Sequence, residues 1–265
     1  PDVLEMIRKI EARGALDISR RAKQGVGQIF QFAIACGLVS SDPTTHLRGA
    51  LKPRPRVKHM SRLPLTELPQ FLLKLKKYEE EGDRRSAITR DAVTFALLTW
   101  VRTKELRFAV RSEFEDLDGK APVWRIPAER MKMGREHFVP LSKLAATIAR
   151  RMIIASTGEF LFPGVAPKKP LSENTMIYAL YRLGYHSRQT VHGFRGLAST
   201  WANEQLVEFG KPAMWIRRYH EDWVEMQLAH SEDNEVRGAY NAAEYLVPRR
   251  RMMQDWADFL ADQEK

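Results

Sequence analysis

The chain has 265 residues, a formal net charge of +10 and one cysteine, Cys36. This length predicts one large or two modest domains, each able to bury a core. The single cysteine excludes a disulfide framework and favours a reducing, cytoplasmic location. No cysteine and histidine cluster has zinc-site spacing, and we expect neither metal nor cofactor. The positive charge fits an anionic partner, but it also fits an ordinary basic protein.

Membrane insertion is not expected, because no apolar run reaches the length of about 18 residues that a spanning helix needs. The chain opens with Pro-Asp-Val-Leu-Glu, without an initiator methionine or the regions of a signal peptide. We therefore expect a fragment of a longer protein.

Residues 1–51 predict a small helical domain. Val3, Ile7 and Ile10 recur at helical spacing and predict a first helix. A second helix is predicted from about Ser19 to Cys36, with an apolar stripe and with Gly37 as its C-cap. Its other face is basic, which indicates either an ordinary solvated surface or contact with DNA phosphates. The basic residues concerned are Arg20, Arg21 and Lys23.

Residues 52–62 form a basic linker. Two prolines prevent a regular helix there and favour an extended chain. Such a segment can follow DNA phosphates, or it can be a plain charged connection between domains. Its basic residues are Lys52, Arg54, Arg56, Lys58 and Arg62.

A second domain begins at residue 63. Thr66 is predicted to cap a helix through Lys77, and residues 84–100 predict a largely buried helix. Arg102 follows directly, and a charge beside a buried helix is costly unless it is paired. Glu105, three residues later, is the local partner, which could also mean a purely structural ion pair.

The next segment predicts a small antiparallel sheet of three strands. These strands are Phe108–Phe114, Val123–Ile126 and His137–Val139, and the second connection contains Lys132. A lysine on a turn is most often solvent-exposed and without a role. The fold class is therefore mostly α with a three-stranded antiparallel sheet.

Helices resume at Ser142–Ala155 and again from Ser172 through Leu183. Asn174 and Thr175, on the second of these helices, could read DNA base edges or phosphates, although an ordinary surface helix explains them equally well. His192 and Arg195 follow, spaced to lie on one helix face.

The last third of the chain carries His230 and, ten residues later, Tyr240. Tyr245 is a second candidate, but its apolar surroundings near Pro248 favour packing. A helix from about residue 248 carries the narrow apolar stripe Met252, Trp256, Phe259 and Leu260.

Four sequence boxes in this order resemble the catalytic domain of tyrosine recombinases, the phage-type integrases. They are Thr-Trp-Val-Arg-Thr-Lys-Glu-Leu, then Pro-Ala-Glu-Arg-Met-Lys-Met with Val-Pro-Leu-Ser, then His-Gly-Phe-Arg, then Leu-Ala-His with Ala-Tyr-Asn. The wording is most similar to the P4-type integrases of genomic islands.

The resemblance implies a site-specific recombinase that cleaves and rejoins DNA through a 3′-phosphotyrosine intermediate. It implies an incomplete core-binding domain at 1–51, the linker at 52–62, and a catalytic domain at 63–265 whose last helix docks on a neighbouring protomer. Glu105 would support the site locally. The implied catalytic residues are Arg102, Lys132, His192, Arg195, His230 and Tyr240.

This residue set suits metal-free phosphoryl transfer. Guanidinium groups bind phosphate oxygens bidentately and stay charged, and a tyrosine ester stores the phosphodiester energy. Lys132 would protonate the 5′ oxygen, His192 would accept the tyrosine proton, and His230 would donate to the phosphate. The sequence departs from the family pattern at Trp100, where glycine is common, and at Lys104, where a small residue is common.

The expected partners are double-stranded DNA attachment sites, further copies of the chain forming a tetramer in synapsis, and DNA-bending or directionality proteins. A missing N-terminal arm-binding domain is also implied. Two alternatives remain open: a catalytically silent DNA-binding regulator of the same fold, and a topoisomerase IB-like nicking-closing enzyme. A serine resolvase is disfavoured because no serine lies in comparable surroundings.

Overall fold

The protein divides into two compact units, Pro1–His59 and Met60–Lys265, each of which is described by itself. The structure is a computed structural model, and of Arg48 it describes only the backbone. The described residues are 2–53, 61–80, 86–156, 158–166, 168–211, 213–230 and 244–264.

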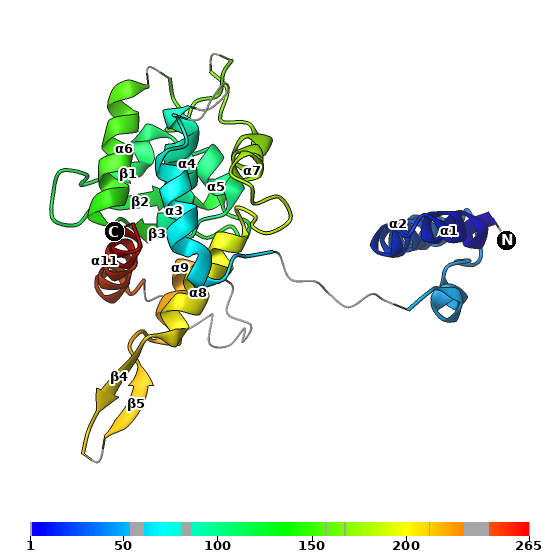
Figure 1. Cartoon of the computed structure of the whole chain (residues 1–265). Coiled ribbons are helices and arrows are strands. Elements are labelled where there is room, and N and C mark those ends of the chain that lie inside the picture. The colour runs from blue at the N-terminus through cyan, green and yellow to red at the C-terminus, as the bar shows by residue number, and fades with distance from the viewer. Residues whose placement is uncertain are drawn as a thin grey trace. The chain divides into compact units, whose positions relative to one another are not determined.

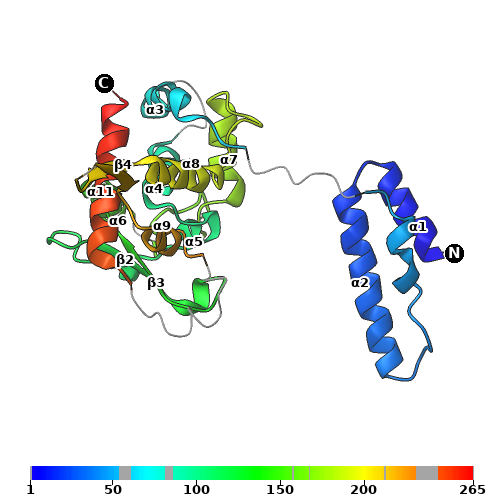
Figure 2. The ribbon, with the colours of Figure 1, turned by 90° about the horizontal axis from the view of Figure 1, so that it is seen from below.

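The first unit contains the antiparallel-packed helices α1 (Asp2–Ala12) and α2 (Leu16–Ala35) and the 3₁₀ helix η1 (Thr45–Ala50) (Figures 1 and 2). Helix α2 begins earlier than predicted. It ends as expected at Gly37, whose φ of 72° is left-handed and whose N–H bonds the carbonyl of Ile34 at 3.0 Å.

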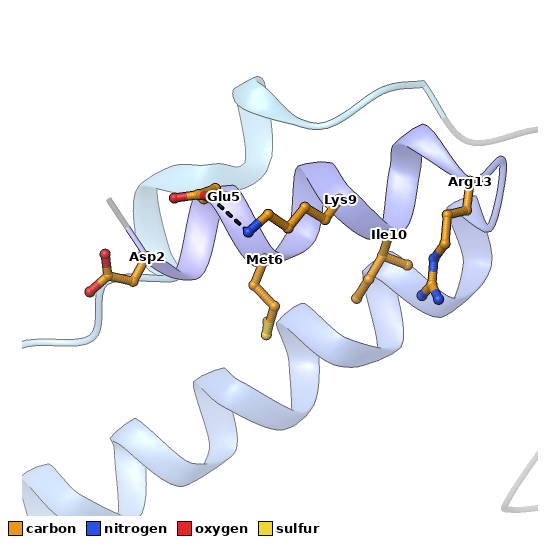
Figure 3. Close-up of a pocket in the computed structure, with 6 residues that line it drawn as sticks. All are labelled: Asp2, Glu5, Met6, Lys9, Ile10 and Arg13. Carbon is orange, nitrogen blue, oxygen red and sulfur yellow. Dashed lines mark ion pairs between the residues drawn. The ribbon is translucent and has the colours of Figure 1, made fainter.

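Much of the apolar surface of α2 is open to solvent within this unit. Ile29 is 68% exposed and Phe32 is 70% exposed. A shallow hollow lies along α1, where Glu5 and Lys9 form an ion pair at 2.8 Å (Figure 3). None of the predicted catalytic residues lines this hollow. Its lining residues are Asp2, Glu5, Met6, Lys9, Ile10 and Arg13.

The second unit is built around helix α4 (Ala87–Thr99), which contacts α3, α5, α6, α7, α8 and α11 (Figure 1). Ser86 caps its start by accepting a hydrogen bond from the Thr89 N–H at 3.2 Å. The other helices are α3 (Leu68–Lys76), α5 (Thr103–Arg107), α6 (Lys143–Ala155), α7 (Glu173–Arg182), α8 (Gly193–Glu204), α9 (Glu221–Gln227) and α11 (Leu246–Asp262).

The small sheet has the predicted antiparallel order. Strand β2 (Val123–Ile126) lies between β1 (Phe114–Glu115) and β3 (His137–Pro140), with Ile126 opposite His137. Its inner face packs Trp124 and Val139 into the core. The predicted fold class, mostly helical with a three-stranded antiparallel sheet, is confirmed.

The first predicted strand is wrong over most of its length. The predicted segment Phe108–Phe114 forms a turn and the 3₁₀ helix η3 (Arg111–Glu113). The reason is local capping, since the Glu113 carboxylate accepts from the Val110 N–H at 3.3 Å and from the Trp124 indole at 2.9 Å. These contacts turn the chain before it can pair as a strand.

The predicted helix cap at Thr66 is also wrong. A 3₁₀ turn, η2 (Leu65–Glu67), precedes α3, whose N-cap is Glu67. The predicted inward-facing residues are buried nevertheless, because the helical spacing of the apolar positions holds whichever residue starts the helix. They are Leu68, Phe71, Leu72 and Leu75.

A β-hairpin between α8 and α9 was not predicted. Strands β4 (Leu206–Phe209) and β5 (Met214–Arg217) pair antiparallel and extend away from the helical body (Figure 1). Two arginines at the base of this hairpin are paired with acids. Arg217 contacts Glu221 at 3.3 Å, and Arg218 contacts Asp255 at 2.9 Å.

Helix α11 packs on its own unit. Trp256 donates to the Leu97 carbonyl at 2.9 Å and lies against Trp100 and Trp201. The neighbouring-protomer docking that the family resemblance implied stays a prediction. No helix in the described part of the chain is long and apolar enough to cross a membrane.

Candidate active site

Arg102 lies at the start of α5, directly after a sharp turn at the end of α4. Trp100 makes this turn with a left-handed φ of 62°, a conformation that favours glycine. Its buried ring packs edge-on against Trp256, with ring centroids 6.2 Å apart. The departure from the family's glycine therefore places a strained but well-packed residue two positions before Arg102.

Glu105 holds Arg102 at two points. Its carboxylate accepts from the Arg102 backbone N–H at 2.7 Å and from Nη1 at 2.8 Å. The remaining Nη2 donates to the Ala229 carbonyl at 2.9 Å. Glu105 is buried and Arg102 remains partly open to solvent, so the guanidinium is fixed in direction but accessible.

Arg195, on α8, is almost fully buried. Nη1 donates to the Trp100 carbonyl and Nη2 donates to the Leu228 carbonyl at 2.6 Å. Burial, with a smaller contribution from the charge of Arg102, lowers the pKa of Arg195 from 12.5 to about 10. It therefore stays charged at neutral pH, beside a second cation, and an anion entering here would meet both.

His230 completes this group. Its Nε2 lies 3.3 Å from Arg195 Nη2, and its Nδ1 lies 2.6 Å from Glu225 Oε2. The carboxylate favours a proton on Nδ1, which assigns the tautomer from the contacts. Glu225 was not predicted from the sequence, and its position five residues before His230 was the signal available.

His192 lies at the N-cap of α8, with its side chain exposed. Its pKa is lowered below 6.5, first by burial of part of the ring and then by the positive charges of Arg195, Arg102 and His230. The imidazole is therefore neutral near pH 7 and able to accept a proton.

Lys132 is not brought into contact with the arginines. It lies exposed in the turn between β2 and β3, and no hydrogen bond or ion pair joins it to another described residue. Its neighbour Arg130 is occupied by an ion pair with Glu113. The role of Lys132 as the acid therefore stays a prediction.

Tyr240 lies outside the described residues, between His230 and the start of α11. Tyr245 is described and has a left-handed φ of 46° at the N-cap of α11. The predicted nucleophile therefore stays a prediction from the sequence.

The predicted DNA-binding residues are placed singly on the surfaces of the two units. Arg20 donates to the Lys52 carbonyl at 2.6 Å, and Arg21 pairs with Asp17 at 3.0 Å. Arg62 donates to the Gly196 carbonyl at 2.9 Å. Lys23 and Lys52, and Asn174 and Thr175 near the start of α7, are exposed or half-buried, whereas Arg54, Arg56 and Lys58 lie outside the described residues.

A second buried polar group lies beside the arginines and was missed entirely. Arg249, Gln227 and His137 are all buried, and the His137 ring hydrogen-bonds the backbone of Gln227. Burial and the charges of Arg249, Arg195 and Arg102 hold the pKa of His137 well below 6.5. In the sequence these residues are only separate polar positions, which gave no indication that they pack together.

Two family models together match most of this chain. The phage integrase family matches residues 62–246, and the phage integrase central domain matches residues 1–50. The chain belongs to the phage integrase family.

Among curated relatives, the integrase of Enterobacteria phage P4 is 38% identical over 97% of this chain and 58% of its own length. The prophage integrase IntZ of Escherichia coli K12 is 39% identical over the same shares. The predicted resemblance to P4-type integrases is confirmed. The chain spans a little over half the length of these relatives.

Solved structures share the fold. A lambda integrase dimer bound to a COC′ core site matches with a TM-score of 0.62 at 18% identity, over 88% of this chain and 61% of that one. The Tn1549 transposon integrase in complex with circular intermediate DNA matches with a TM-score of 0.60 at 15% identity, over 95% and 83%. A lambda integrase tetramer bound to a Holliday junction gives 0.62 at 16%, over 88% and 64%.

Proposed function

We propose that this protein is a site-specific recombinase that cleaves and rejoins DNA through a 3′-phosphotyrosine intermediate. The observation that carries the proposal is the convergence of Arg102, Arg195 and His230 on the single turn that ends α9. Two oriented cations and an imidazole at one point suit a phosphodiester whose negative charge grows as it is attacked.

The phosphate would be bound before it is broken. Arg102 and Arg195 would contact its non-bridging oxygens, and His230 would add a hydrogen bond from Nε2 when protonated. Glu105 orients Arg102, and Glu225 orients His230. Because both groups are already oriented, neither has to reorganise during the reaction. In other phosphoryl-transfer enzymes one such arginine contributes roughly 10³–10⁵ in rate.

The covalent step balances without a metal or ATP. The Tyr240 oxygen would attack phosphorus as the bond to the 5′ oxygen breaks. The tyrosine proton would pass to His192, whose lowered pKa leaves it neutral at pH 7, and Lys132 would give a proton to the leaving 5′ oxygen. Attack by a 5′ hydroxyl on the aryl ester would reverse the step and rejoin the strand.

The partners proposed are double-stranded attachment sites and further copies of this chain, forming a tetramer in synapsis. Structures of lambda integrase, a dimer on a core site and a tetramer on a Holliday junction, support this assembly by analogy of fold. The basic residues of the helical unit and linker would follow phosphates. We propose a cytoplasmic, nucleoid-associated location, with DNA-bending or directionality proteins as further partners.

The two alternatives are not favoured. A silent regulator would have no need to retain the arginines, the histidines and the late tyrosine together, and the similarity to P4 and prophage integrases argues against a topoisomerase.

Covalent trapping tests the proposal. The full-length protein is mixed with nicked duplexes that carry its element's junction, so that cleavage releases a short strand and cannot reverse. A protein–DNA adduct on a denaturing gel, formed in EDTA without ATP and lost in Tyr240→Phe but kept in Tyr245→Phe, is expected. An adduct that still forms with Tyr240→Phe would contradict the assignment of the nucleophile. The absence of an adduct with the wild-type protein would contradict the proposed function.

A further inference from the structure

Gln227 links the two backbone turns that hold the candidate phosphate-binding arginines. Its side-chain Nε2 donates to the Thr99 carbonyl at 2.9 Å. One residue further along each segment, Arg195 joins the Trp100 carbonyl to the Leu228 carbonyl. The same two turns are therefore cross-linked twice at consecutive residues, once by a neutral amide and once by the guanidinium.

Arg249 fixes the orientation of that amide. Its Nε and Nη2 lie 3.2 and 2.9 Å from Gln227 Oε1. Because a guanidinium can only donate, the amide oxygen must face Arg249 and the amide nitrogen must face Thr99. The direction of the first cross-link is therefore set by the first turn of α11.

Arg249 also anchors this pair to two other parts of the fold. Nη2 donates to the Phe138 carbonyl of β3 at 2.5 Å, and Nη1 donates to the Glu244 carbonyl at 2.9 Å. Phe138 belongs to the hairpin that carries Lys132. One side chain thus joins α9, α11 and the sheet beside the site.

This arrangement is costly as packing alone. The Arg249 side chain is 0% exposed, and the one carboxylate oxygen paired with it among the described residues, on Glu244, lies 3.8 Å away. Its charge is held mainly by carbonyl and amide dipoles, which only partly offset the loss of water. An apolar side chain of similar volume would satisfy a merely structural position at lower cost.

We propose that Gln227 and Arg249 are positioning residues. They hold the carbonyls of Trp100, Leu228 and Ala229 in the places where these accept hydrogen bonds from Arg195 and Arg102. The inference rests on the proposed function, because it concerns the step at which those arginines meet the phosphate. Both side chains are buried, which suits a role that acts through other residues. Their effect reaches the reaction through the arginines, and a displacement of about 1 Å can cost roughly 10²-fold in rate.

The test uses Gln227→Met, which keeps the volume and removes the amide. Single-turnover adduct formation is measured on the nicked duplex, together with DNA affinity and thermal unfolding. We expect the rate to fall roughly 10²-fold while affinity stays within about threefold of wild type. Arg251→Met is the control on α11, because Arg251 is exposed two residues after Arg249 on that helix, and it should cleave like wild type.

A double-mutant cycle separates positioning from loss of structure. Added to Arg195→Lys, Gln227→Met should lower the rate clearly less than it does in the wild-type protein, since one of the two arginines that it positions is already replaced. Added to Lys132→Met, it should keep its full effect. A general loss of structure would instead multiply with both substitutions equally.

Three results decide the matter. Wild-type cleavage by Gln227→Met, or an equal loss in both backgrounds, overturns the inference and leaves the proposed function intact. No adduct from wild type overturns the proposed function itself. If Gln227→Met fails to fold, Gln227→Met combined with Arg249→Met replaces the pair by apolar groups, and a folded but slow double variant is the expected result.

Discussion

Arg102 and Arg195 are held by adjacent carbonyls of one turn: Arg102 Nη2 lies 2.9 Å from the Ala229 oxygen, and Arg195 Nη2 lies 2.6 Å from the Leu228 oxygen. The two arginines are 93 residues apart in the sequence. The turn therefore gathers two cations that would otherwise repel each other. It also places His230, the next residue, beside Arg195.

This shared turn predicts that neither arginine can be replaced by lysine. In Arg195→Lys one ammonium cannot bridge the Trp100 and Leu228 carbonyls and also contact a phosphate. We expect single-turnover adduct formation to fall by roughly 10³-fold. Arg150→Lys, at a half-exposed position on α6, is the control and should be neutral. Near-normal cleavage by Arg195→Lys would rule out its proposed role.

Glu225 is predicted to act through His230. Removal of its carboxylate in Glu225→Ala leaves the His230 ring without its Nδ1 partner. We expect cleavage to slow about tenfold, comparable to the loss of one charge-assisted hydrogen bond. In a His230→Ala background the same change should have little further effect. Glu221→Ala, on the exposed first turn of α9, should leave the rate unchanged.

His137 is predicted to make the fold sensitive to acid. Its folded-state pKa lies well below the 6.5 of the unfolded chain, because burial and three arginines disfavour the imidazolium. Above about pH 6.5 both states are neutral and this site adds no pH dependence. As pH falls below 6.5, the unfolded state takes up the proton first, so the free energy of unfolding decreases.

The measurement for His137 is urea unfolding at pH 7.5 and pH 5.5 for wild type and His137→Leu. Wild type should lose on the order of 1 kcal/mol more than the variant between these two pH values. Equal losses in the two proteins would show that another group carries the acid sensitivity.

Trp100→Gly is predicted to destabilise the protein, although glycine would adopt the left-handed backbone conformation at this position without strain. Relief of the strain contributes about 1–2 kcal/mol, whereas loss of a buried tryptophan costs roughly 3–5 kcal/mol. The net expectation is a loss of about 2–3 kcal/mol, measured by chemical denaturation. A gain in stability would mean that the contact with Trp256 contributes little.

Local patterns sufficed for much of the fold and for part of the site. The i, i+3 spacing of Arg102 and Glu105 predicted their pairing, and alternating apolar residues predicted β2 and β3. The strand predicted at Phe108–Phe114 failed because a single carboxylate, Glu113, caps the turn, and no periodicity reveals such a contact.

Long-range polar contacts could not be derived from the sequence. Arg249 sits in a run of three arginines that looks solvent-exposed, yet it is the one that the first turn of α11 directs into the core. Gln227 and the carbonyls of Leu228 and Ala229 acquire their roles only when α4, α8 and α9 meet. Backbone acceptors have no signature in the sequence at all.

The most direct test of the central claim is to find the residue that carries the DNA. The adduct formed on a nicked duplex is digested with nuclease and trypsin, and the nucleotide-bearing peptide is fragmented in a mass spectrometer. Trypsin should release residues 238–249, which contain both Tyr240 and Tyr245. We predict a 3′-nucleotide phosphate on Tyr240. The same mass on Tyr245, or on any other residue, would contradict it.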